Sequence, residues 1–101
     1  MKVQLLTFPG CPNAPAARES LRRVLAEMGL PPDFEEIDTS SPATLPELRG
    51  WSSPTILVNG RDAGGLEGPA GAGSCRLYRD ESGRSHSPSD ALIRGALLKA
   101  M

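Results

Sequence analysis

The sequence has few cysteines, one histidine and no long hydrophobic run, and each of these features argues against a particular class of protein. Its apolar stretches fall far short of the roughly 20 residues that span a bilayer, so we expect no membrane association. The formal net charge is -1, and no basic stripe is present to bind phosphates, which argues against nucleic acid as a partner. The beginning, "MKVQLLTFPG", lacks the features of a signal peptide, and we therefore expect a cytoplasmic location.

The shortage of metal-binding side chains is equally informative. The chain has 2 cysteines, Cys11 and Cys75, which in a cytoplasmic protein are more typical of reduced thiols than of a structural disulfide. The single histidine, His86, lies in a Ser-rich loop, where solvation is the simpler interpretation. Together these residues form no recognisable metal-ligand spacing, so the sequence predicts no metal site and no required cofactor.

What is present is an ordinary globular composition with alternating strand and helix patterns. With 101 residues, 39% of them hydrophobic, the chain is expected to form a single domain over residues 1–101. Helical spacing of apolar residues precedes Gly29, and a second, shorter helix is expected within 40–50 and a third over 91–101. Strands are expected at 2–8, 34–38, 54–60 and 75–80, with a Gly-rich connector at 61–74. The order βαβαββα predicts an α/β fold, a four-stranded mixed sheet flanked by helices.

The most informative stretch is "FPGCPNAPAARESL", residues 8–21, where a lone cysteine stands between the first strand and the first helix. The unpaired N–H groups and dipole of a helix N-terminus favour a thiolate over a thiol. If Cys11 is the cap, Pro12 falls at the favoured first helical position. If Asn13 is the cap, Pro15 fits the first turn, and Cys11 stands outside the helix and gains less from it. The first arrangement is favoured, and a buried, inert cysteine is the alternative to both.

These residues carry a resemblance to a known family. The order of elements, the "GCP" turn and "SPT" at the head of the third strand resemble the thioredoxin fold in its smaller glutaredoxin-like form, over nearly the whole chain. The chain is most similar to uncharacterised thioredoxin-like proteins of bacteria and archaea that carry "GCPN" and "SPT". The resemblance implies that Pro54 is a cis-proline facing a reactive Cys11. It further implies that Pro12, Ser53, Pro54 and the Thr55 backbone bind the substrate.

The chain departs from the family pattern at one decisive position, because Ala14 stands where a dithiol motif requires cysteine. Cys11 therefore cannot resolve its own mixed disulfide with a neighbour. A small thiol such as glutathione could act as the second partner, or Cys75 could resolve from a distance. If Cys75 begins the fourth strand, it lies roughly 17 Å from the strand end nearest the site, beyond the roughly 7 Å that a disulfide allows. A half-buried strand cysteine is therefore the favoured interpretation of Cys75.

Two functional hypotheses follow. The first is a monothiol redox protein in which Cys11 exchanges with a small thiol or a protein disulfide. The second is a noncatalytic binding or adaptor module that holds a soft metal or a partner through Cys11. Nothing in the pattern fixes an oligomeric state. Trp51 is a weaker candidate, either as a shield of the site or as a core residue. A further set of residues could contact glutathione, although surface solvation or capping is the simpler role of each: Arg49, Arg79, Gly83, Arg84, Ser87 and Ser89.

Overall fold

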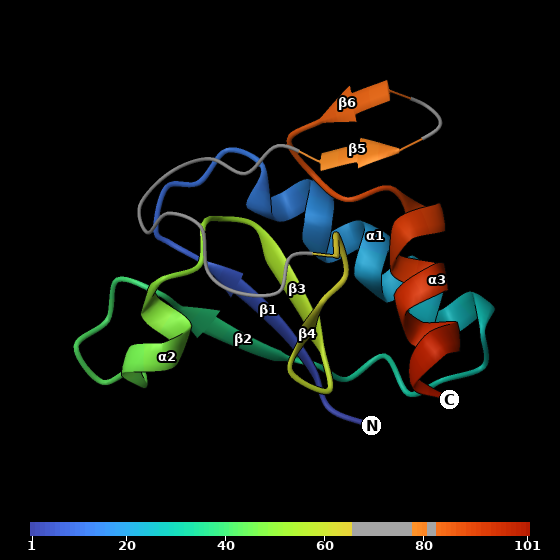
Figure 1. Ribbon diagram of the computed structural model, residues 1–101, viewed down its shortest axis with the longest axis horizontal. Coiled ribbons are helices and arrows are strands. Elements are labelled where there is room, and N and C mark those ends of the chain that lie inside the picture. Colours follow the sequence, from blue (N-terminus) through green and yellow to red (C-terminus); the bar gives the residue numbers. More distant parts are fainter. Residues whose placement is uncertain (66–77, 81–82) are drawn as a thin grey trace.

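The computed structural model describes residues 1–65, 78–80 and 83–101. Three helices and six strands alternate along this part of the chain (Figure 1). In chain order they are β1 (Val3–Thr7), α1 (Ala14–Glu27), β2 (Glu35–Asp38), α2 (Pro46–Arg49), β3 (Thr55–Val58), β4 (Arg61–Asp62), β5 (Tyr78–Asp80), β6 (Gly83–Ser85) and α3 (Asp90–Ala100). None of the described helices is long and apolar enough to cross a membrane.

The main sheet has four strands in the order β2-β1-β3-β4 and mixes parallel with antiparallel pairs. Strand β1 pairs in parallel with β2, and on its other side it pairs antiparallel with β3, where Leu6 is opposite Thr55. A two-residue turn joins β3 to β4. Its residues Asn59 and Gly60 both have positive φ, 52° and 81°, the backbone that a tight hairpin requires and that Asn-Gly supplies readily.

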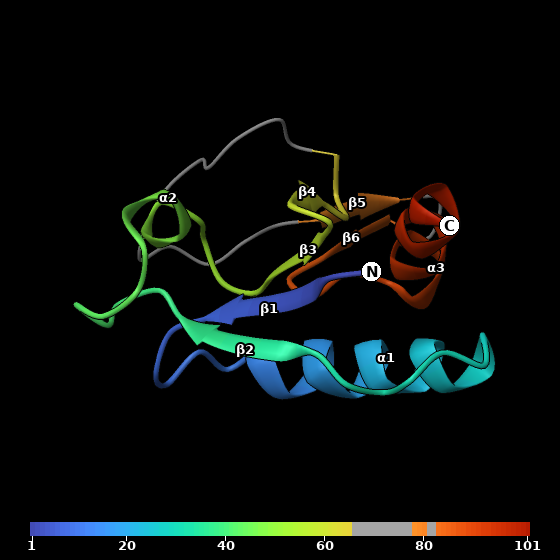
Figure 2. The same cartoon turned by 90° about the horizontal axis from the view of Figure 1, so that it is seen from below.

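Both faces of the sheet are apolar, and Figure 2 shows α1 and α2 on opposite sides of it. Val3 and Leu5 of β1 alternate with Leu6, as expected for a strand whose side chains point to opposite faces. The larger cluster combines residues of β1, β3, α1 and α3: Val3, Leu5, Ala17, Leu21, Val24, Leu25, Ile56, Val58, Ile93 and Leu97. On the opposite face, Leu6 and Leu57 pack with Trp51. Strand β1 is therefore buried from both sides, which agrees with its adjacent apolar residues Leu5 and Leu6.

Three boundary predictions are wrong. The fourth strand of the main sheet is β4, within the segment 61–74 that was predicted to be connector, because the Asn-Gly turn returns the chain directly into pairing with β3. The predicted strand at 75–80 contributes β5, which pairs only with β6 among the described strands and forms a separate two-stranded sheet. Strand β6 lies where only a loop was expected. The second helix covers Pro46–Arg49, inside the segment 40–50 where a short helix was expected.

Candidate active site

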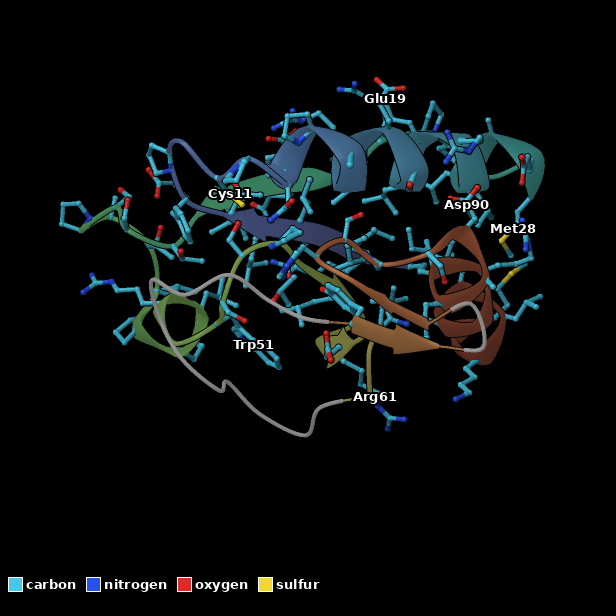
Figure 3. All side chains as sticks on the ribbon, turned by 90° about the horizontal axis from the view of Figure 1, so that it is seen from above. Cys11, Glu19, Met28, Trp51, Arg61 and Asp90 are labelled. Carbon is cyan, nitrogen blue, oxygen red and sulfur yellow. The ribbon has the colours of Figure 1, made fainter. Side chains whose placement is uncertain are left out.

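A tight turn holds Cys11 between β1 and α1. The Cys11 N–H donates to the Phe8 carbonyl at 3.2 Å, and the Ala14 N–H donates to the Cys11 carbonyl at 3.3 Å. Gly10 has a φ of 82°, a conformation that glycine adopts without the steric cost borne by other residues. Cys11 is a free cysteine and only 6% exposed. Figure 3 shows it beside the carboxyl end of β1.

The helix begins later than favoured from the sequence. Asn13 is the N-cap residue and α1 starts at Ala14, so the prediction that Cys11 caps the helix is wrong. Pro15 explains the difference, because a proline in the first turn lies where no intrahelical bond is lost. Starting the helix at Cys11 would move Pro15 deeper into it. Cys11 therefore gains less from the helix end than a capping thiol would.

The loop before β3 lies at the same edge of the sheet. Since β1 and β3 are antiparallel, the carboxyl end of β1 lies beside the amino end of β3, and the turn with Cys11 meets the loop with Pro54 there. The Ser53–Pro54 peptide bond is cis. Ser53 and Thr55 are 0% exposed, and the Thr55 hydroxyl donates to the Ser52 carbonyl at 2.6 Å. The Ser53 hydroxyl has no hydrogen-bond partner among the described residues.

A residue from β5 completes this edge. The Tyr78 hydroxyl donates to the Pro54 carbonyl at 2.5 Å, and Tyr78 is itself only 3% exposed. Sequence reasoning does not place Tyr78 here, because it predicts residues 75–80 as a strand of the main sheet. The one available signal was its being the only tyrosine of the chain, a side chain that usually finds a polar partner when buried.

One comparison with known proteins decides the family. A curated thioredoxin of Methanocaldococcus jannaschii is 34% identical to the chain over 64 residues, which are 59% of this chain and 72% of that protein. The chain belongs to the thioredoxin-like superfamily. Its four-stranded mixed sheet with flanking helices confirms the predicted thioredoxin-like fold, and the membership supports a thiol redox role in general. No family model matches the chain, and no solved structure gives a significant match.

In this thioredoxin-like protein, Trp51 is a core residue, which is one of the two roles predicted for it. It is 6% exposed and packs with Leu6 and Leu57 beneath the sheet edge. Arg49 also has a structural role, because its guanidinium donates to the Thr44 and Pro42 carbonyls at 2.8 and 2.6 Å. It thereby holds the loop between β2 and α2, and its charge is not directed at Cys11 by these bonds.

The start of α3 lies apart from Cys11. Ser89 is its N-cap, and the Ser89 hydroxyl accepts from the Leu92 N–H at 3.1 Å. Asp90 accepts two hydrogen bonds from Arg23, at 2.8 and 2.9 Å. Arg23 lies about 14 Å along α1 from Ala14, and Figure 3 shows Asp90 well separated from Cys11. Ser89, one of the residues predicted as a possible glutathione contact, is therefore not brought to the thiol.

Several of the remaining predicted residues lie outside the part of the chain that the structure describes. Cys75 lies outside the described residues, as do the side chains of Arg79 and Arg84. The 17 Å estimate for Cys75, roughly five strand steps, assumed that 75–80 belonged to the main sheet, and that assumption is wrong. His86 is exposed. Within the described part, no group of three metal-ligating side chains occurs.

A surface hollow lies at the other end of β3. It has a volume of about 880 Å³ between β4 and α3, and its lining includes Val58, Asn59, Arg61 and Lys99. Val58 is the last residue of β3 and Asn59 follows it, at the end opposite to Thr55, so the hollow is remote from the edge with the thiol. Cys11 is not among the residues that line this hollow.

Proposed function

We propose that this chain is a thiol-dependent redox protein that uses Cys11 alone as its nucleophile. One observation carries the proposal: a free cysteine follows β1 at the sheet edge where the loop with Pro54 precedes β3, while Ala14 occupies the position of a second cysteine. A single thiol at this place can form a mixed disulfide but cannot release it with a neighbouring thiol.

The proposed reaction is monothiol disulfide exchange. The Cys11 thiolate attacks one sulfur of a disulfide, a new Cys11 S–S bond forms, and the other sulfur leaves as a thiolate. A second thiol then attacks the mixed disulfide, restores Cys11 and completes the exchange. Glutathione or another small thiol is the proposed second partner, and Cys75 is the internal alternative. Pro12 borders the thiol, and Ser53, Pro54 and the Thr55 backbone are the proposed contacts of the substrate.

The burial of the thiol favours a second candidate function. Cys11 is 6% exposed, and a buried cysteine commonly behaves as a small hydrophobic residue. On this alternative the chain is a noncatalytic binding or adaptor module that holds a soft metal or a partner through Cys11. The two candidates differ in whether the thiol of the folded protein exchanges with disulfides.

Treatment with oxidised glutathione near neutral pH, followed by intact mass and peptide mapping, distinguishes them. The proposal predicts a glutathione adduct on Cys11, or an internal Cys11–Cys75 disulfide, before any adduct on Cys75 alone. Cys11→Ser should abolish both products, and Cys75→Ser should leave the Cys11 adduct. If both cysteines of the folded protein stay unmodified, the redox function is refuted and the binding module replaces it.

A further inference from the structure

The substrate-binding loop of the proposed function is inaccessible in this structure. Ser53 and Thr55 are 0% exposed, and Pro54 is below 2%. A substrate chain that pairs with the backbone of this loop must touch its atoms, and none of Ser53 or Thr55 can be touched from solvent. An extended protein segment therefore cannot bind along the loop in this conformation.

Tyr78 is hydrogen-bonded to the Pro54 carbonyl, a polar group that such a segment would contact. Its hydroxyl donates to the Pro54 carbonyl at 2.5 Å, in a contact that leaves the tyrosine 3% exposed. Tyr78 begins the β5–β6 hairpin, which pairs with no described strand of the main sheet and stands apart from β1–β4 in Figure 1. The Tyr78–Pro54 hydrogen bond is a contact of a side chain with a carbonyl and takes no part in the pairing of β1 with β3.

Cys11 is less completely enclosed than this loop. It retains 6% exposure, and the flanking Gly10 and Pro12 are exposed. A thiol with this geometry can be reached by a small molecule that approaches past the turn. It cannot be reached by a folded protein that has to align a segment on residues 53–55 first.

We propose that Tyr78 determines the substrate class of the Cys11 site by keeping the Pro54 loop closed to protein chains. The inference rests on the proposed monothiol function. With the Tyr78–Pro54 hydrogen bond in place, Cys11 exchanges with low-molecular-weight disulfides: an S–S bond forms between Cys11 and one half of the disulfide, and the other half leaves as a small thiolate. Exchange with a protein disulfide requires this hydrogen bond to break.

The test compares a small and a large disulfide on the full chain carrying Cys75→Ser, so that Cys11 is the single thiol. Oxidised glutathione and insulin are the two probes, and mixed-disulfide formation is followed by intact mass. Each rate is divided by the rate of free cysteine with the same probe, which removes the intrinsic difference between the probes. With Tyr78 unchanged, the normalised rate of the Cys75→Ser protein should be at least tenfold higher with oxidised glutathione than with insulin.

Tyr78→Phe removes the hydroxyl and keeps the ring. We expect its insulin rate to rise about 2- to 13-fold, the factor that corresponds to one hydrogen bond's net contribution, with the glutathione rate changed less than twofold. Thr44→Val is the matched control. The Thr44 hydroxyl also donates to a backbone carbonyl, that of Asp38 at 2.5 Å, but in the loop before α2, so both rates should stay unchanged.

The possible results distinguish a failure of the proposed role of Tyr78 from a failure of the proposed monothiol function. If insulin and oxidised glutathione react equally fast, or if Tyr78→Phe leaves the insulin rate unchanged, the role of Tyr78 is refuted and the monothiol function stands. If Cys11 reacts with neither probe in the folded protein, the proposed function is refuted and the inference falls with it. Because the comparison of the two probes needs no Tyr78 variant, it decides the size limit even if Tyr78→Phe folds poorly.

Discussion

Ser53→Ala is predicted to stabilise the protein, which is the opposite of what most substitutions of buried residues do. The Ser53 hydroxyl is 0% exposed and has no hydrogen-bond partner among the described residues. Burying an unpaired hydroxyl costs about 1–3 kcal/mol. Removing the oxygen leaves a void no larger than a methyl group, which costs at most about 1 kcal/mol. The free energy of unfolding should therefore rise by about 1 kcal/mol.

Thr55→Val is the matched control, since Thr55 is the other fully buried hydroxyl residue of the loop. Its hydroxyl donates to the Ser52 carbonyl at 2.6 Å, so its loss should lower the free energy of unfolding by about 1–3 kcal/mol. Urea unfolding at equilibrium measures both changes, and an unchanged m-value shows that the unfolded state is not altered. If Ser53→Ala destabilises the protein as much as Thr55→Val does, the Ser53 hydroxyl is satisfied in solution and the reasoning is wrong.

Two further predictions concern the packing of the helices. Leu21→Ala should cost about 2–5 kcal/mol of unfolding free energy because Leu21 is 0% exposed in the main core, whereas Leu98→Ala, at a site 58% exposed, should change it by less than about 0.5 kcal/mol. Equal effects in thermal unfolding would contradict the assigned core. Arg23→Gln should lower the free energy of unfolding slightly at neutral pH, because the exposed Arg23–Asp90 ion pair is lost. The hydrogen bonds from Arg23 lower the pKa of Asp90 from its ordinary 3.8, so this cost should vanish as the pH falls well below 3.8. A cost that persists in acid would show that the ion pair is not its source.

The strands of the core could be predicted because neighbouring apolar residues in a strand point to opposite faces of the sheet, and both faces must then be covered. The adjacent Leu5 and Leu6 of β1 indicate a strand covered on both faces, and these two residues do belong to opposite clusters. The Asn59–Gly60 turn was likewise evident from its residue types. What the periodicity could not show was that only two residues, Arg61 and Asp62, would follow the turn as a strand, because so short a strand has no repeating pattern.

For the candidate site, sequence reasoning placed Cys11 and Pro54 together but predicted neither the start of α1 nor the contact with Tyr78. Cys11 and the Pro54 loop do lie at one edge of the sheet, as the resemblance implied. The start of α1 was predicted incorrectly because both Pro12 and Pro15 are suited to the first turn of a helix, and the sequence does not show which of them lies there. Tyr78 was missed because its hydrogen bond to Pro54 joins residues 24 positions apart, a contact that depends on how the hairpin packs.

The central claim is that Cys11 is a reactive single thiol, and the modification of the folded protein by oxidised glutathione tests it most directly. The account predicts a mixed disulfide that peptide mapping places on Cys11, present in Cys75→Ser and absent in Cys11→Ser. An unmodified Cys11 in the folded protein, with full modification after unfolding, would contradict the claim and show that the thiol is a buried packing residue.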